Sequence, residues 1–518
     1  MSADAGQPAP AVAPRRLQPL VAASASTARS SVVVSASFLL SSALAGLLAL
    51  LIAVIVGESA DTDGFLAAYS AYLTFILFGS TLRVALVPLL GSTADERAFR
   101  ERAADRVGRL VAAGGLAAAV LLASSPLLGR ALVPSASGAA QSTAAASVAI
   151  LSAAAFCQIW SAALSAVLGA ARRFVSSALL YVLSAAVAVG LGAALMAVVG
   201  IAGAGIGVLG GGVVLLAGHL GYLRRFEFVA APAWRSALRA TTWRLAALAA
   251  AGAAVPFVLQ LDATISLATV SDRAGAVTAY SYAYFVTVLA TGITAGVIGL
   301  VTMPGLVASL ADRGREVADE YLTATAPFSL FLYVPIAAGY ATFGRPVLDA
   351  LLEGPLTSAS LDLLWDASRI FLLMGLSWAL LAPLTTLALS LGLHLRLAVV
   401  TVAIVPVHTA LVLAASGVGP VTVAAAHALS GTLLVVAITL LIFRLRALRA
   451  VAHALRASLP AAPLALVFPV LGALGLAGEG ALKALAGLVA ASVLYAALSV
   501  ALWRSVAGQA IRLLRERS

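Results

Sequence analysis

Two charged side chains lie deep inside apolar stretches of this sequence, and they are its first candidates for chemistry. Arg83 lies seven residues before the inner end of one stretch, about 10 Å along a helix. Intramembrane charges usually face a cavity or reach the interface on a long stem. Tyr72, Ile76 and Gly79 follow helical spacing and share a helix face with Arg83. We predict that Arg83, Tyr72 and Gly79 bind a phosphate-bearing substrate; the alternative is that Arg83 extends to the interface.

Asp262 is the second such residue, about eight residues from the outer end of another apolar stretch and next to Gln260. A carboxyl group at that depth is either protonated or paired with a cation, which favours a functional role. It lies about 15 Å deeper than Arg83, counted from the inner side at 1.5 Å per residue, so we treat the two as separate elements. His408 and His427 fall in two further stretches. Either could be a neutral imidazole bonded to a carbonyl or part of a proton relay.

The composition places these residues in a membrane protein. The chain has 518 residues, 62% of them hydrophobic and 10% charged, with a mean hydropathy of +1.06. Soluble domains carry about 25% charged residues. The formal charge of +11 comes from short Arg clusters between apolar stretches, which indicates topology rather than a nucleic-acid interface. The single cysteine, Cys157, excludes an intrachain disulfide and a cysteine-based zinc site.

Apolar windows bounded by charge or turn residues predict an all-α polytopic membrane protein with fourteen spans. The spans are 32–56, 64–90, 110–133, 143–171, 174–199, 201–223, 245–270, 278–310, 321–343, 367–391, 395–416, 419–443, 460–478 and 481–503. Arginines cluster in alternate connections, which predicts that both termini are cytoplasmic.

Grouping these spans gives five predicted segments: two six-helix lobes, an additional helix pair and two tails. The segments are a disordered cytoplasmic tail at 1–31, lobes at 32–223 and 245–443, a helix pair at 460–503 and a basic cytoplasmic tail at 504–518.

The connections leave little room for an enzyme active site. Glu58, Asp61 and Asp63 lie in an outer loop too short to build a sugar-nucleotide or metal site. We expect Asp61 or Asp63 to cap the following helix, and we predict neither catalytic nor metal-binding residues.

An internal repeat links the two lobes. The second span opens with Tyr69 and Tyr72 and the eighth with Tyr280 and Tyr282, and each runs to a proline near its inner end. Six spans per repeat give both halves the same orientation, so a cavity between two parallel lobes is expected.

These segments resemble the lipid II flippase family (MurJ/MviN-like) of the multidrug/oligosaccharidyl-lipid/polysaccharide exporter superfamily. One match runs from Asp61-Thr62-Asp63-Gly64-Phe65 to Val87-Pro88, and the other from Gly275-Ala276-Val277-Thr278-Ala279-Tyr280 to Met303-Pro304. Fourteen spans with both ends inside also fit the family. The resemblance implies a flippase of peptidoglycan and cell-wall synthesis, which moves a polyprenyl-pyrophosphate precursor across the membrane by alternating access.

For the substrate head group, the resemblance implies a role for Asp63, the one matching polar position at that end of the cavity. The family's cavity arginines fall here on Leu48, Ile76 and Phe285, all apolar. Either Arg83 replaces them or the substrate differs from lipid II.

For coupling, the resemblance makes Asp262 the equivalent of a seventh-span acid that helps to hold a cation. Its expected eleventh-span partner falls near Thr409. Sodium and proton coupling both remain open at this point, and no other cofactor is predicted.

The leading prediction is therefore a plasma-membrane flippase whose partners are a lipid-linked glycan and membrane lipids, with no nucleic acid. A groove of the last two spans is expected to hold the polyprenyl tail. One alternative is an exporter of small cationic or amphiphilic compounds. Another is a non-transporting membrane scaffold in an envelope-assembly complex.

Overall fold

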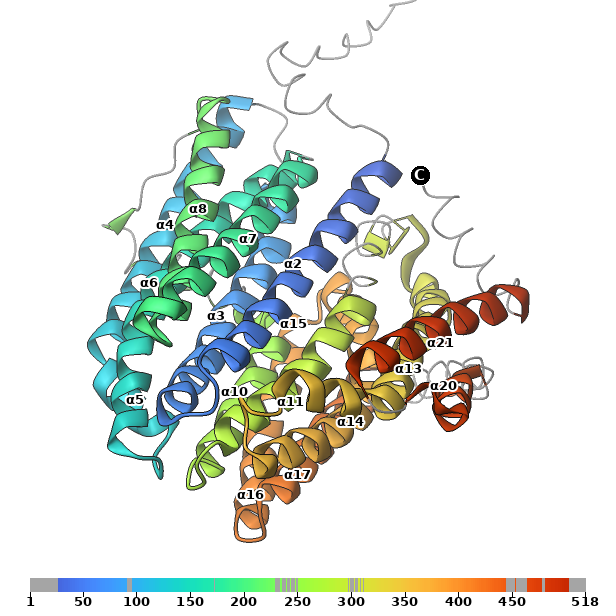
Figure 1. Cartoon of the computed structure of the whole chain (residues 1–518). Helices are drawn as coiled ribbons and strands as arrows, with labels where there is room; N and C mark the ends of the chain where they lie inside the picture. Colours follow the sequence, from blue (N-terminus) through green and yellow to red (C-terminus); the bar gives the residue numbers. More distant parts are fainter. Residues whose placement is uncertain are drawn as a thin grey trace, which may run out of the picture.

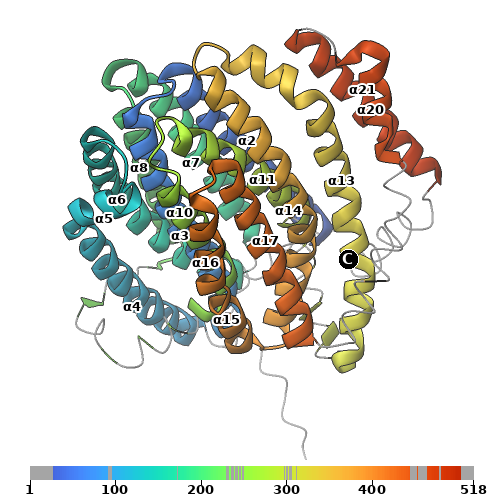
Figure 2. The same ribbon diagram turned by 90° about the horizontal axis from the view of Figure 1, so that it is seen from below.

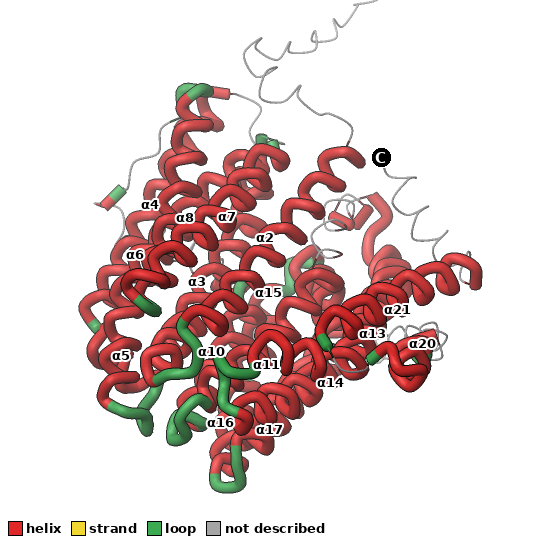
Figure 3. The backbone as a smooth tube through the Cα atoms, in the orientation of Figure 1, coloured by secondary structure: helices red, strands yellow, loops and turns green. Residues whose placement is uncertain are grey.

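Helices form almost all of the described chain, which confirms the predicted all-α class (Figure 3). The computed structural model describes residues 27–90, 96–171, 173–228, 251–296, 312–443, 464–477 and 480–502, with isolated residues in between. No β-strand occurs within these ranges. Of the first predicted tail at 1–31, residues 1–26 lie outside the described residues and residues 27–31 belong to a helix. The second predicted tail at 504–518 also lies outside the described residues.

The helices of the N-terminal half are α2 (Thr27–Ile55), α3 (Ala60–Leu90), α4 (Glu96–Ala123), α5 (Ser125–Leu132), α6 (Gly138–Ala170), α7 (Phe174–Val199) and α8 (Ala202–Arg224). Those that follow are α10 (Ala254–Thr269), α11 (Ala276–Thr291), η2 (Gly292–Gly296), η3 (Gly314–Glu316), α13 (Val317–Leu352), α14 (Ser358–Ser390), α15 (His394–Val402), α16 (Ile404–Ser416), α17 (Pro420–Ala437) and η4 (Ile438–Phe443). The chain closes with α20 (Val467–Leu471), η5 (Gly472–Leu476) and α21 (Ala481–Leu502).

Where the structure describes them, the predicted spans overlap one helix or consecutive helices. Among the described residues, 10 helices are long and apolar enough to cross a membrane. Shorter apolar helices cover Ala254–Thr269, Val467–Leu476 and Leu482–Leu498. The α3 helix accounts for the second predicted span.

Several helices extend beyond their apolar windows because charged residues can continue a helix outside the bilayer. The predicted spans leave a connection at 344–366, but α13 and α14 are joined by residues 353–357 alone. Thr357 caps α14, because its hydroxyl accepts from the N–H of Ser360. Arg345 of α13 reaches Asp349 at 2.7 Å and Asp362 of α14 at 2.6 Å.

Helices α2–α8, which we call the N-lobe, and helices α10–α17, which we call the C-lobe, pack in the same order (Figures 1 and 2). In the N-lobe, α3 packs on α6, α6 on α8, α7 on α8, and α2 on α7. The equivalent C-lobe pairs are α11 with α14, α14 with α17, α16 with α17, and α10 with α16. This correspondence supports the internal repeat seen in the sequence.

The last two spans lie outside this pair of lobes, beside α13. Figure 2 shows α20 and α21 against α13 and away from the N-lobe. Phe343 of α13 shares a small apolar core with Phe468 of α20 and Tyr495 of α21.

Glycines allow α7 and α8 to pack closely. A Cβ atom added at Gly207 would lie 2.5 Å from the Cα of Gly192. Small residues at such contacts let helix backbones approach in a membrane, where apolar burial between helices contributes little.

Candidate functional site

The two lobes are joined by hydrogen bonds at one face, which carries the α2–α3 and α10–α11 connections and is the predicted outer face. Asp63 of α3 is 4% exposed and points across the lobe boundary. Its carboxylate accepts from the N–H groups of Gly275 and Thr278, both at 2.9 Å, and from the Thr278 hydroxyl at 2.6 Å. These donors form the start of α11, so a carboxylate from one lobe caps a helix of the other.

A second carboxylate makes the same kind of contact nearby. Glu58 accepts from the N–H of Thr357 at 2.9 Å and from its hydroxyl at 3.0 Å, at the N-terminus of α14. Gly275 has a φ of +74°, and a Cβ atom there would collide with the Glu58 carboxylate, so both conformation and space require glycine. We call Glu58, Asp63, Gly275, Thr278 and Thr357 the outer latch.

The expected capping of α3 by Asp61 or Asp63 is therefore wrong. Ser59 performs it instead, because its hydroxyl accepts from the N–H of Thr62 at 3.1 Å. Asp61 accepts from the Thr143 hydroxyl at 2.5 Å, and Asp63 caps a helix more than 200 residues away. Sequence spacing could not show this, because the helix that Asp63 caps lies in the other half of the chain.

A polar contact continues the lobe boundary toward the interior. The Gln260 side-chain amide of α10 donates to the Ser70 hydroxyl of α3 at 2.6 Å, and Thr264 lies 3.2 Å from the same oxygen. The residue preceding Ser70, Tyr69, meets Phe285 of α11 edge to face, with ring centroids 6.1 Å apart. The lobes are thus held together from the outer latch to the middle of α10.

The opposite face of α10 contributes to a buried polar cluster inside the C-lobe, which we call the α10 cluster. It consists of Asp262 and Ser266 of α10, Tyr280 of α11, His408 of α16, and His427 and Ser430 of α17, all buried. The nearest nitrogen of His408 lies 3.9 Å from a carboxylate oxygen of Asp262. The other carboxylate oxygen, Oδ1, has no hydrogen-bond partner in the described part of the chain.

His408 is the centre of the α10 cluster. Its Nε2 lies 2.8 Å from the backbone carbonyl oxygen of Asp262, and its Nδ1 lies 2.7 Å from the Ser430 hydroxyl. His427 packs against the His408 ring, and its Nδ1 lies 2.9 Å from the Tyr280 hydroxyl. The sequence presented Asp262, His408 and His427 as separate residues in three spans, and only helix packing joins them.

The other predicted ion-coupling residue, Thr409, bonds within its own helix. Its hydroxyl donates to the carbonyl of Val405 in its own helix at 2.9 Å. The structure brings the preceding residue, His408, to Asp262 instead, because a helix turns by about 100° per residue.

The predicted substrate-binding residues are spread over two places. Asp63 belongs to the outer latch, whereas Tyr72 and Gly79 lie at the contact between α3 and α6, where Gly79 approaches Ala162. The backbone of Arg83 is helical, but its side chain lies outside the described residues. Leu48 is buried, and Ile76 and Phe285 pack partly buried against the same core.

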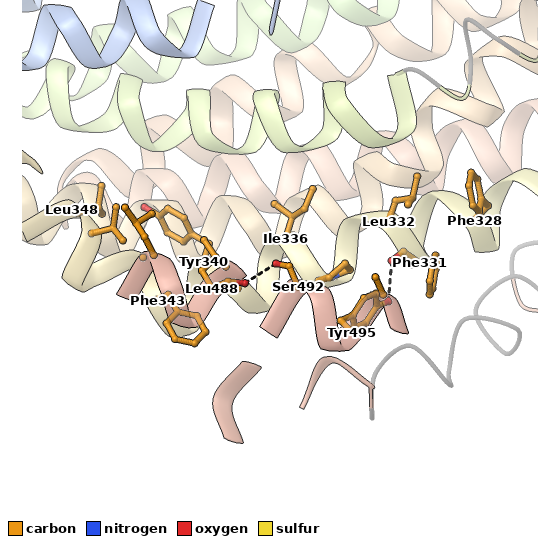
Figure 4. A pocket seen from close by; sticks show the side chains of 16 residues that line it. Phe328, Phe331, Leu332, Ile336, Tyr340, Phe343, Leu348, Leu488, Ser492 and Tyr495 are labelled. Atoms are coloured by element: carbon orange, nitrogen blue, oxygen red, sulfur yellow. Dashed lines mark hydrogen bonds between the residues drawn. The ribbon is translucent and has the colours of Figure 1, made fainter. Parts of the chain in front are cut away.

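An apolar groove lies between α13 and α21, the last span, where the sequence predicts a groove of the last two spans (Figure 4). Its volume is about 630 Å³. Its lining includes Phe331, Leu332, Ile336, Tyr340, Phe343, Leu348, Leu485, Leu488, Ser492 and Tyr495. Two of its three hydroxyl groups are satisfied internally, because Ser492 donates to the carbonyl of Leu488 and Tyr495 donates to the carbonyl of Phe331. The third, of Tyr340, has no hydrogen-bond partner in the described part of the chain.

Comparison with known proteins gives one family match and several structural matches. The family model described as lipid II flippase MurJ matches residues 52–446. No curated protein matches the chain.

Among solved structures, a lipid II flippase MurJ in an inward closed conformation has a TM-score of 0.72 and 16% identity, covering 92% of this chain and 99% of that one. A transporter of the MOP superfamily from Pyrococcus furiosus has a TM-score of 0.59 and 15% identity, covering 85% of this chain and 98% of that one. An inward-facing multidrug resistance MATE transporter has a TM-score of 0.59 and 15% identity, covering 80% and 95%. At these identities the structural matches establish the fold.

Proposed function

The chain belongs to the lipid II flippase MurJ family, and from this premise we propose which helices contact the head group and which contact the lipid tail. It is a multi-pass membrane flippase of a lipid-linked cell-envelope precursor. We propose that the head group passes between the lobes α2–α8 and α10–α17 by alternating access. The polyprenyl tail stays in the groove between α13 and α21, and both termini are cytoplasmic.

The groove is the observation that supports this division. A polyprenyl chain loses the hydrophobic contribution of its methylene groups if it follows a charged head group through a polar path. The groove offers an apolar surface beside the lobes, and the Ser492 and Tyr495 hydroxyls that line it are already bonded to helix carbonyls. A tail lying there can remain in an apolar environment while the head group crosses.

The outer latch supports alternating access. In this conformation two carboxylates of the N-lobe cap two helices of the C-lobe, so the predicted outer face is closed. Opening that face must separate each carboxylate from its helix N-terminus and expose both to water, where their hydrogen bonds are replaced. The same groups can therefore close and reopen without a covalent change.

The head group requires a cation, because a pyrophosphate is costly to desolvate without positive charge. The apolar Leu48, Ile76 and Phe285 cannot supply it. We propose that Arg83, on the half of α3 that leads to the predicted inner face, contacts the phosphate before the lobes close around it.

The experiment fills the groove and measures flipping. Ser492 lies at its centre, and Ser492→Trp replaces open volume with an indole ring (Figure 4). We expect flipping of fluorescent lipid II by the full chain in liposomes to fall by about tenfold or more, the ratio that corresponds to about 1.4 kcal/mol. Val493→Trp is the matched control, because Val493 is exposed on the same helix and does not line the groove.

Equal rates in the two variants would contradict the tail site. A wild-type protein that binds fluorescent lipid II but moves none of it across the bilayer would contradict the proposed function itself.

A further inference from the structure

We propose that Asp262 and His408 form a proton-binding site, and that α10 transmits its occupancy to the contact between the lobes. The inference rests on the proposed function, because it assigns the coupling ion to the flippase. It is carried by the contacts of the α10 cluster.

The first argument is charge. Asp262 is 1% exposed, and among the described residues its one ion-pair contact is with His408, which is fully buried. A lone carboxylate in this interior is strongly disfavoured. One added proton makes the pair neutral overall, whether it resides on the carboxylate or on the imidazole.

The second argument is hydrogen bonding around His408. The carbonyl of Asp262 accepts from Nε2, and the Ser430 hydroxyl lies 2.7 Å from Nδ1. The Ser430 hydroxyl also lies 2.8 Å from the carbonyl of His427. When Ser430 donates to that carbonyl, its oxygen can accept from Nδ1–H; when His408 is neutral, Ser430 can donate to Nδ1. The site therefore has partners for both protonation states of His408.

Within the described residues, the neighbouring titratable groups lack hydrogen-bond partners for a second protonation state. From α17, His427 has no partner for Nε2 in the described chain and is packed among the rings of Tyr280, Tyr284 and Phe371. From α11, Tyr280 and Tyr284 present neutral phenols, and Tyr284 donates to the carbonyl of Leu259.

The helices α3, α5 and α15 also pack on α10, but among described residues none of them brings a charged group within ion-pair distance of Asp262. The Asp262–His408 pair is therefore the place where a proton is held.

The ligand types favour a proton over an alkali cation. A hard cation needs several oxygen ligands converging on one point. The Thr409 hydroxyl is turned toward Val405, and the position facing Asp262 is occupied by an imidazole.

The two faces of α10 connect this site to the lobe boundary. Asp262 and Ser266 face α16 and α17, whereas Gln260 and Thr264 contact Ser70 of α3. Loss of the proton leaves a net negative charge inside the C-lobe, which favours a conformation that admits water to Asp262. A shift of α10 toward that conformation also moves Gln260 relative to Ser70, which weakens this hydrogen bond between the two lobes.

The test measures lobe separation without any lipid substrate. Spin labels at Ala139→Cys and Asp272→Cys, in a Cys157→Ala background, report the distance across the predicted outer face in full-length protein in nanodiscs. We expect the distance distribution to shift between about pH 5 and pH 8, with a population change of about tenfold. Adding sodium at constant ionic strength should leave it unchanged.

Two variants identify the site. His408→Gln should abolish the pH-dependent shift, and the near-isosteric Asp262→Asn should give one distribution at every pH. His219→Gln is the matched control, because it removes a buried histidine from the N-lobe, and it should retain the wild-type shift.

A pH response that survives in both His408→Gln and Asp262→Asn would overturn the proposal, as would a response to sodium alone or no response to pH in the wild type. Flipping of fluorescent lipid II by the same samples separates the two claims. Proteins that flip the lipid without any pH-dependent shift would leave the proposed function standing and remove the proton site.

Discussion

The two lobes pack their helices alike, yet their buried histidines lie in opposite kinds of surroundings. In the N-lobe, His219 has a partner at each ring nitrogen: the carbonyl of Leu215 at 2.9 Å and the Ser177 hydroxyl at 3.1 Å. Ser177 in turn meets the Ser165 hydroxyl at 2.6 Å. These two partners of His219 are a backbone carbonyl and a hydroxyl, both neutral groups.

The C-lobe network contains a carboxylate and unmet hydrogen-bonding capacity. Asp262 Oδ1 and His427 Nε2 both lack a partner within the described residues. A buried imidazole is therefore no sign of function by itself. It becomes one when an acid lies beside it and when its surroundings accept a second N–H, because the pair can then gain or lose a proton.

The largest expected effect is that of Asp262→Asn. The amide keeps the shape of the side chain but cannot take up a proton. We expect flipping of fluorescent lipid II in liposomes to fall by about tenfold or more and to lose its response to a pH gradient. Thr409→Val is the control, since its hydroxyl bonds only within α16 in the described structure, and it should keep near-normal rates. If the control lost as much activity as Asp262→Asn, the assignment of coupling to the α10 cluster would be wrong.

A matched pair of hydroxyl deletions tests the comparison directly. Ser177→Ala and Ser430→Ala each remove a hydroxyl that faces a buried histidine nitrogen, one in each lobe. Each should lower the free energy of unfolding by about 1 to 3 kcal/mol, because a buried polar group loses a partner. Thermal unfolding measures that loss. Only Ser430→Ala should alter the pH dependence of lobe separation, and identical pH profiles for the two variants would remove the distinction between the lobes.

The smallest effect is expected at the lobe boundary. Ser70→Ala removes the acceptor of the Gln260 amide, a neutral hydrogen bond with a net contribution of about 1 kcal/mol. The spin-label distances should shift toward the separated population by about fivefold, with the pH response retained. Ser377→Ala serves as the control because its hydroxyl faces Thr432 within the C-lobe. A shift of equal size in that control would show that the Ser70 contact does not link the lobes.

The helical spans were largely predictable from sequence, because hydropathy over about 20 residues acts locally. The predicted span 174–199 coincides with α7, whereas the predicted start of α14 at residue 367 is nine residues late. The error arose because Asp362 and Asp366 were treated as loop residues. Both lie in the first turns of a helix capped by Thr357, and Arg345 of α13 pairs with Asp362.

The candidate site was predictable only in part. Asp262 stood out because a carboxyl group inside an apolar stretch is rare, and Asp63 because it matched a family position. The atoms that these two carboxylates contact could not be predicted from the sequence. The partner of Asp63 is 212 residues away at Gly275, and Thr409 was expected where its neighbour His408 is found.

By itself, the sequence determined that this chain forms membrane helices in two similar halves, because apolar length and arginine distribution act through the bilayer and need no partner helix. Tertiary structure alone decided that Asp63 caps α11 and that Asp262 meets His408. Those contacts depend on how helices distant in sequence rotate and pack, where a turn of about 100° exchanges one residue for the next. The same packing order in both lobes placed a neutral network in one and an ionisable pair in the other.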